Sequence, residues 1–236
     1  MTTIPQNLQT VQAQIAQACV TAKRNLASVT LLAVSKTQNP SALREAYGAG
    51  LTAFGENYIQ EALEKIAALH DLPLQWHCIG PLQSNKTKPV AEQFDWVHSI
   101  DRLKIAQRLS EQRPAGLPPL QVCLQVNIDS GDTKSGVAPE DAPALALAVA
   151  ALPRLTLRGL MTIPEPTIEF EAQLAVHKYA AALFDQIKSS LGQHAAEFDT
   201  LSMGMSADLS AAIQAGSTMV RVGTAIFGGR AKVVKT

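Results

Sequence analysis

The sequence predicts an α/β protein in which eight parallel strands and their helices close into a (β/α)8 TIM barrel. Short apolar segments alternate with helical patterns along the chain, and this alternation implies parallel strands joined by right-handed crossovers. Eight such units in roughly 200 residues match the size of the fold. Residues with reactive or ligand-binding side chains follow most of the expected strands, where barrels of this type hold their sites.

The first expected strand, Thr30–Ser35, contains the four consecutive apolar residues Leu31–Val34, a pattern typical of a strand buried on both faces. Seven further segments complete the set of expected strands. They are Thr52–Phe54, Gln75–Ile79, Trp96–His98, Leu120–Val126, Leu157–Thr162, Thr200–Met203 and Met219–Val222.

Helical spacing appears first at the N-terminus, where Leu8, Val11 and Ile15 recur within Ile4–Leu26. We expect Asn39, which precedes Pro40, and Asp101 to cap the helices that follow them. The helices expected between the strands are Pro40–Gly48, Tyr58–Leu69, Ser84–Glu92, Arg102–Gln112, Pro139–Leu152, Phe170–Leu191 and Ala207–Ala215.

The segment after the last expected strand, Gly228–Thr236, is too short for an eighth outer helix. We therefore expect the helix at Ile4–Leu26 to pack on the barrel at this gap, and residues 1–236 to form one domain. An open, doubly wound sheet remains the competing architecture.

Composition excludes several classes of protein. Hydrophobic residues make up 47% of the chain and charged residues 17%, as in a globular protein with a sizeable core. The formal net charge is zero, so nothing indicates a nucleic-acid partner or an anionic membrane surface. Cys19, Cys78 and Cys123 lack CxxC spacing and are interpreted as reduced thiols. With no visible signal peptide and no apolar stretch of about 18 residues, we expect a cytoplasmic monomer without a metal site.

Lys36 is the most informative single residue, because it follows the apolar strand Thr30–Ser35 directly. An amine at the end of such a strand projects into the space that the strand ends surround. A partly desolvated lysine loses proton affinity, and a neutral amine can attack a carbonyl carbon, which makes Lys36 a candidate Schiff-base lysine. The alternative is a lysine that extends its charge into solvent from the start of a loop.

Two loops carry a pattern suited to phosphate. Ser202–Ser206 follows the seventh expected strand, and Gly223 and Thr224 follow the eighth. Phosphate is bound by backbone N–H groups at glycines and by hydroxyl donors, and barrels often bind it after these two strands. We expect Ser206 to cap the helix that begins near Ala207, and the alternative is that these residues are ordinary turn glycines and a capping serine.

Arg221 lies within the eighth expected strand, one residue before Val222. A buried guanidinium cannot lose its proton and needs an acceptor, either a carboxylate or a ring nitrogen of a ligand. A lysine amine, a phosphate cradle and such an arginine together describe a pyridoxal 5′-phosphate (PLP) site. An arginine facing the pyridine nitrogen keeps that nitrogen unprotonated and makes the ring a poorer electron sink.

At these residues the chain closely resembles the pyridoxal phosphate homeostasis protein family. The resemblance covers nearly the whole chain in order. Its segments are Ala33–Lys36, Phe54–Glu61, Trp76–Lys86, His98–Asp101, Gln125–Ile128, Lys134–Gly136, Leu157–Thr162, Leu201–Ser206 and Gly216–Gly228.

The resemblance implies a barrel like the N-terminal domain of alanine racemase, with the vitamin B6 cofactor PLP held as a Schiff base on Lys36. It also implies roles for other residues: Ser202, Gly204, Gly223 and Thr224 as phosphate ligands, Arg221 facing the ring nitrogen, and Asn57 and His77 near the cofactor. The chain departs from the family pattern at Ala207, where an acid is common, and at Gly131, where a glutamate is common.

Three functions follow from these residues, and we expect the first. It is a non-catalytic carrier that buffers PLP and delivers it to apo-enzymes. The second is an amino-acid racemase, which needs an acid/base group on each face of the substrate. Lys36 supplies one such group, and of Tyr47, Tyr58 and Tyr179 only Tyr58 closely follows a motif at the strand ends. The third is a Schiff-base aldolase without a cofactor.

Overall fold

Eight strands form a closed barrel with the order β1 to β8 in the computed structural model, which describes residues 3–129 and 135–228. All neighbouring strands are parallel, and β8 pairs with β1 to complete the ring. The strands are β1 (Thr30–Val34), β2 (Ala53–Glu56), β3 (Gln75–Cys78), β4 (Trp96–Ile100), β5 (Leu120–Val126), β6 (Leu155–Thr162), β7 (Thr200–Ser202) and β8 (Met219–Val222). The predicted barrel is confirmed. The open doubly wound sheet is wrong, because its first and last strands would stay unpaired at the edges, whereas β1 and β8 pair with each other here.

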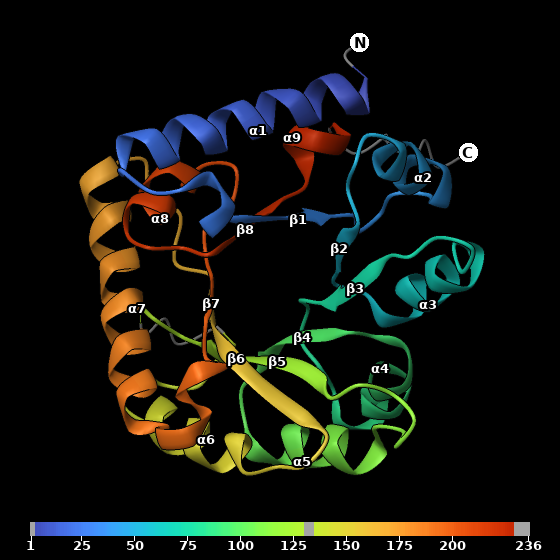
Figure 1. Cartoon of the computed structure of the whole chain (residues 1–236), viewed down its shortest axis with the longest axis vertical. Helices are drawn as coiled ribbons and strands as arrows, with labels where there is room; N and C mark the ends of the chain where they lie inside the picture. Colours follow the sequence, from blue (N-terminus) through green and yellow to red (C-terminus); the bar gives the residue numbers. More distant parts are fainter. Residues whose placement is uncertain (1–2, 130–134, 229–236) are drawn as a thin grey trace.

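The helices surround this barrel (Figure 1). Short 3-10 turns lie at Leu26–Ser28, Ser84–Lys86 and Gly192–Ala196. The helices are α1 (Ile4–Thr21), α2 (Pro40–Gly48), α3 (Ile59–Ala68), α4 (Thr87–Gln93), α5 (Leu103–Gln112), α6 (Ala142–Ala150), α7 (Phe170–Ser190), α8 (Leu209–Gln214) and α9 (Thr224–Phe227).

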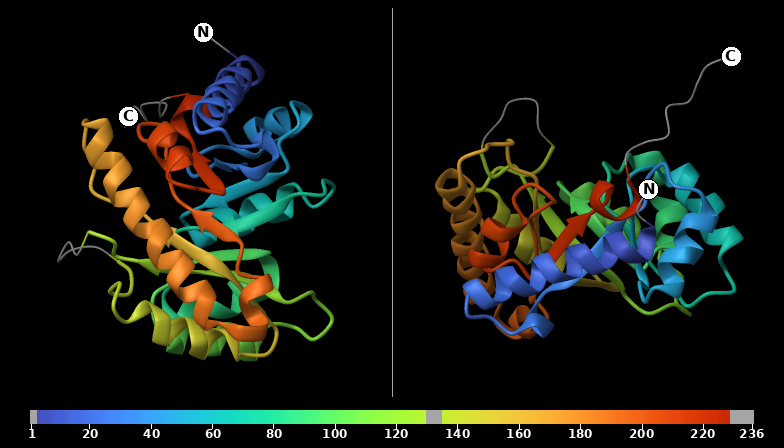
Figure 2. Two further views of the ribbon diagram at one scale, coloured as in Figure 1. Left: turned by 60° about the vertical axis from the view of Figure 1, so that its left-hand side comes forward. Right: turned by 90° about the horizontal axis from the view of Figure 1, so that it is seen from above.

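Among the described residues only the single-turn helix α9 follows β8, and helix α1 covers this side of the barrel. It lies along the side of the barrel formed by β8 and β1, and it contacts α2, α8 and the single-turn helix α9 (Figures 1 and 2). The Nδ2 group of Asn7 donates to the carbonyl of Ile226 at 2.9 Å, and Arg24 donates to the carbonyls of Ile213 and Ser217. Helix α1 is shorter than the expected Ile4–Leu26, because Lys23 adopts a left-handed conformation with φ 53° that ends the helix.

Expected and observed strands differ by at most two residues at either end. The helices differ more, by up to five residues at the end of α1, where the helix ends at Thr21 rather than at the expected Leu26. The expected helix Ser84–Glu92 is a 3-10 turn followed by α4, because Pro89 cannot donate to the carbonyl four residues earlier. Asn39 caps α2 through the Ala42 N–H as expected, but the cap expected at Asp101 is wrong. Its carboxylate instead pairs with the side chain of Arg102, the residue at the N-cap of α5.

Alternation along the strands divides the core into an outer and an inner part. Side chains such as Ala33 and Phe54 point outward and pack under the helices in the main apolar cluster. The inner face carries two small apolar clusters, one around Leu32 and Met219 and the other around Trp96. Polar side chains also lie on this inner face, and they contribute to the functional site. Among the described residues, no helix is both long and apolar enough to cross a bilayer.

Candidate functional site

A cavity of about 340 Å³ opens at the carboxyl ends of β1 and β8, next to the loop that follows β7. This volume falls within the usual range for small-ligand sites, about 300–1,000 Å³. Four of the residues expected at the site line it, namely Lys36, Arg221, Gly223 and Thr224. The other lining residues are Val34, Thr37, Gln38, Met205, Ser206, Ala207 and Gly228.

Strand pairing explains why Lys36 and Arg221 meet. Leu32 is the registered neighbour of Arg221 across the β1–β8 pair, so both side chains lie on the inner face of the barrel. Val34 and Lys36 continue the same alternation toward the carboxyl end of β1. The amine of residue 36 and the guanidinium of residue 221 therefore share one cavity although they come from opposite ends of the chain.

Arg221 is almost fully buried, with 4% of its surface exposed. Its Nη1 donates to the carbonyl and hydroxyl oxygens of Ser202, at 2.6 and 2.8 Å, and its Nη2 donates to the carbonyl of Thr162 at 2.8 Å. Burial lowers the pKa of Arg221 to about 10, so it stays charged near neutral pH. Within the described part of the chain no carboxylate reaches it, and its Nε–H makes no hydrogen bond. This buried cation can therefore donate a hydrogen bond to an acceptor atom of a ligand on its cavity side.

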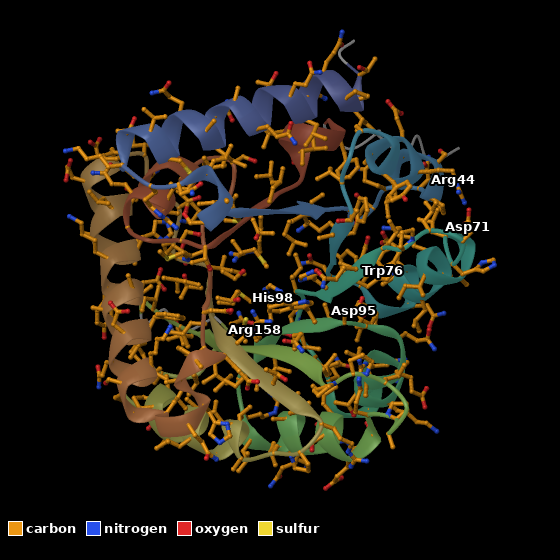
Figure 3. The ribbon with its side chains drawn as sticks, viewed as in Figure 1. Arg44, Asp71, Trp76, Asp95, His98 and Arg158 are labelled. Carbon is orange, nitrogen blue, oxygen red and sulfur yellow. The ribbon has the colours of Figure 1, made fainter. Side chains whose placement is uncertain are left out.

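A chain of hydrogen bonds runs from Arg221 across the barrel interior. The Ser202 hydroxyl is 3.1 Å from Nδ1 of His98, and Nε2 of His98 is 3.0 Å from Nδ1 of His77. Nε2 of His77 in turn lies 3.0 Å from Oε1 of Gln75, near the amino end of β3. Figure 3 shows His98 in the middle of the barrel. We call these five residues the interior relay.

The two ends of the interior relay fix its direction. Arg221 can only donate and Oε1 of Gln75 can only accept, so each intermediate group passes one hydrogen bond onward. Ser202 then donates to His98, His98 donates from Nε2 to His77, and His77 donates from Nε2 to Gln75. In this arrangement both imidazoles are neutral, each with one donor and one acceptor nitrogen. Burial lowers the pKa of His77 to about 3 and holds the pKa of His98 well below its ordinary value, which agrees with this assignment.

Four residues expected at the site do not line the cavity. Ser202 and His77 belong to the interior relay and are buried. Gly204 turns the chain after β7 with φ 93°, where a Cβ would lie 2.5 Å from that of Ala212. Asn57 follows β2, and its Oδ1 is buried without a hydrogen-bond partner.

The loop after β7 presents the hydroxyl of Ser206 to the cavity, although the family resemblance gave Ser202 and Gly204 as the phosphate ligands in this loop. Ser206 is exposed and lines the cavity. It was expected to cap the following helix, but the N-cap of α8 is Asp208. One carboxylate oxygen of Asp208 accepts from the Met205 N–H at 2.6 Å, and the other lies 2.9 Å from Nε2 of His177. Although burial opposes it, hydrogen bonds from His177 and Met205 hold the pKa of Asp208 below its ordinary value. The loop is thereby fixed at the cavity edge.

Chemically, the cavity combines one primary amine, one buried guanidinium and the hydroxyls of Thr37, Ser206 and Thr224. Among the described lining residues, none is a histidine, tyrosine, aspartate or glutamate. Within that same part of the chain, no group of three or more metal-ligating side chains is arranged to hold a metal ion. The cavity is equipped to bind an anionic carbonyl compound through Lys36. Gly131 and Lys134, which were named in the resemblance to the family, lie outside the described residues.

Comparison with known proteins agrees with this fold. The family model for the alanine racemase N-terminal domain matches residues 4–231. A Pseudomonas aeruginosa protein named pyridoxal phosphate homeostasis protein is 61% identical over 230 residues, which is 98% of this chain and 97% of that protein. PipY of Synechococcus elongatus, solved with PLP bound, is 36% identical with a TM-score of 0.79, over 91% of this chain and all of that one.

Alanine racemase from Corynebacterium glutamicum is a more distant structural neighbour. Its TM-score is 0.66 at 17% identity, over 93% of this chain and 62% of the racemase. At that identity the likeness shows a shared barrel.

Proposed function

This chain belongs to the alanine racemase N-terminal domain family and, within it, to the pyridoxal phosphate homeostasis proteins, and from that premise we propose that it binds PLP reversibly in the cavity between β1 and β8. We propose further that it buffers PLP and delivers it to apo-enzymes without turning over amino acids. The observation that carries the proposal is the position of Lys36 and Arg221 on one cavity beside Gly223 and Thr224.

Lys36 is the proposed tether. Its Nζ would hold the aldehyde carbon of PLP through a C=N double bond, formed with the loss of one water molecule. Water or another amine can reverse this bond and restore the free lysine, so the attachment is covalent but releasable. The bound cofactor supplies an electron-withdrawing pyridine ring. Arg221 presents donors only, so a ring nitrogen that faces it remains unprotonated.

The phosphate is proposed to lie between the loop after β7 and the loop after β8. Thr224 and Ser206 offer exposed hydroxyl donors there, and Gly223 leaves its backbone open to close approach. In this assignment Ser202 and Gly204 act indirectly. Ser202 holds Arg221 through its carbonyl and hydroxyl oxygens, and Gly204 turns the loop that presents Ser206.

The lining of the cavity favours a carrier over the alternative, a racemase. Racemisation requires a proton donor and a proton acceptor on opposite faces of the substrate carbon. Lys36 and Arg221 are the basic side chains among the described lining residues, and Arg221 remains charged near neutral pH, so the lining offers no second acid/base group beside the amine. Tyr58 and Tyr179 are each about half exposed, at 54% and 51%, and neither lines the cavity.

Substitution of the lysine tests the tether. Lys36→Ala is expected to abolish the visible absorption band of the PLP complex and the borohydride-trapped adduct detected by peptide mass spectrometry. Lys104→Ala, which removes an exposed lysine on α5, serves as the matched control and should keep both signals. A trapped adduct at another lysine in the wild-type protein would contradict the assignment to Lys36.

Transfer and turnover assays test the carrier role. The PLP-loaded protein should activate an apo-enzyme faster than free dissociation of PLP allows. Incubation with L-alanine, followed by chiral analysis, should give no D-alanine at enzyme-like rates. Sustained formation of D-alanine would refute the carrier function and establish the racemase.

A further inference from the structure

A buried ionic cluster lies behind the turn that carries Lys36. Lys65 of α3 is only 3% exposed, and its Nζ lies 2.8 Å from Oε1 of Glu56 and 2.5 Å from Oε1 of Glu61. Glu56 ends β2 and is 1% exposed, whereas Glu61 lies one helical turn before Lys65 and is 30% exposed. We call these three residues the brace.

The brace is bonded to the backbone on both sides of Lys36. Nζ of Lys65 donates to the carbonyl of Ser35 at 2.7 Å, and the Ser35 hydroxyl donates to Oε1 of Glu56 at 2.5 Å. On the other side, the N–H of Thr37 donates to Oε1 of Glu61 at 2.6 Å. The backbone of residues 35 and 37 is therefore held on both sides of Lys36, whose side chain lines the cavity.

The turn needs such support because its geometry is strained. Thr37 has φ 64°, a left-handed conformation that is rare for a β-branched residue. Conformations of this kind persist only where surrounding contacts hold them, and they often occur at functional sites. The hydrogen bond from Thr37 to Glu61 is such a contact.

The brace and the cavity lie on opposite sides of the strand wall. Side chains alternate along β1, so Ser35 points outward to Glu56 whereas Val34 and Lys36 point inward. None of the three brace residues lines the cavity. An effect of the brace on the cofactor must therefore pass through the backbone of residues 35–37.

We propose that Glu56, Glu61 and Lys65 are positioning residues that hold the Lys36 amine in the orientation required to form and keep the bond to the PLP aldehyde. This inference rests on the proposed function. Bond formation depends on alignment of the amine with the carbonyl carbon, and misplacement by about 1 Å can lower the rate of a reaction roughly a hundredfold. Binding of the phosphate and the ring depends instead on the loops after β7 and β8.

Two ligands separate these contributions. PLP can form the bond to Lys36, whereas pyridoxine 5′-phosphate carries an alcohol in place of the aldehyde and can only bind noncovalently. The dissociation constant for pyridoxine 5′-phosphate divided by that for PLP gives the preference for PLP. In the wild-type protein this ratio measures the affinity that the bond to Lys36 adds. Glu61→Ala removes the acceptor for the Thr37 N–H at a partly exposed position, and it is expected to lower this ratio about tenfold, as loss of a charge-assisted hydrogen bond would.

Glu64→Ala is the matched control, because Glu64 is exposed on the same helix and lies outside the brace. It should leave the ratio unchanged. Glu61→Gln keeps an oxygen acceptor for the Thr37 N–H, and it should retain most of the wild-type ratio. Lys65→Met tests the second side of the turn and should lower the ratio by at least as much as Glu61→Ala, with pyridoxine 5′-phosphate binding retained as evidence of a folded site.

The outcomes distinguish the two proposals. A wild-type protein that binds both ligands equally would refute the Schiff base on Lys36. If the wild-type protein prefers PLP and Glu61→Ala and Lys65→Met show the same preference, the tether stands and the positioning role is wrong. A parallel loss of affinity for both ligands would also overturn the positioning role, because it would mean general damage to the site.

Discussion

Replacing Ser202 with alanine tests the interior relay directly. The Ser202 hydroxyl is fully buried and lies between Nη1 of Arg221 and Nδ1 of His98. In the alanine variant Arg221 keeps the Ser202 carbonyl at 2.6 Å, so this donor is not orphaned. Nδ1 of His98, by contrast, loses its partner. Inverting the tautomer of His98 would not compensate, because its Nε2 would then face the acceptor nitrogen of His77.

The expected cost is that of one unsatisfied buried polar group, about 1–3 kcal/mol in the free energy of unfolding. For a domain of this length each kcal/mol lowers Tm by about 2–4 °C, so Tm should fall by roughly 2–12 °C. Urea unfolding followed by circular dichroism measures the free energy. Ser189→Ala, at an exposed position on α7, is the control and should change it by less than about 0.5 kcal/mol. An equally small change in Ser202→Ala would refute the relay.

Three further predictions concern stability. His77 has a folded pKa of about 3 against 6.5 when unfolded, so the unfolded state binds the extra proton and stability is lost as pH falls below 6.5. Its share is about 2 kcal/mol at pH 5, which urea titrations at pH 7 and pH 5 would detect, and an unchanged midpoint would contradict a neutral buried imidazole. Gly159→Ala should prevent soluble folding, because its Cβ would lie 1.7 Å from the carbonyl oxygen of Thr200; a variant with wild-type Tm would disprove this. Arg24→Met removes the hydrogen bonds to the carbonyl of Ile213, within α8, and to that of Ser217, just after it. Amide exchange in α1 should then become faster, ahead of exchange in the barrel strands.

Much of the fold could be predicted because local pattern and tertiary environment agree. Strands buried on both faces give short apolar runs, and α/β alternation then restricts the topology to a few choices. The same alternation predicted that Lys36 and Arg221 share one site, because the carboxyl ends of all parallel strands lie at one end of a barrel. Side-chain direction within loops follows no such period, so the exposure of Ser206 could not be predicted from spacing.

The interior relay and the brace were not predictable for a different reason. His98 and Ser202 are far apart in sequence, and their contact depends on the registers of strands across the barrel. Lys65 lies in a helical pattern with charged neighbours, where a lysine ordinarily faces solvent. The one local signal was the spacing of Glu61 and Lys65, one helical turn apart, which indicates an ion pair but not its burial.

The pairing of β8 with β1 has a consequence for synthesis of the chain. A ribosome makes β1 and Lys36 well before it makes β8, the partner strand that carries Arg221. Until then β1 has one neighbour, and the cofactor site does not exist. The site therefore exists only in a chain whose barrel has closed. A nascent chain, or one truncated before β8, cannot bind the ligand there. Because a ligand that binds only the closed ring stabilises it, the cellular supply of the vitamin would influence how long each newly made barrel survives.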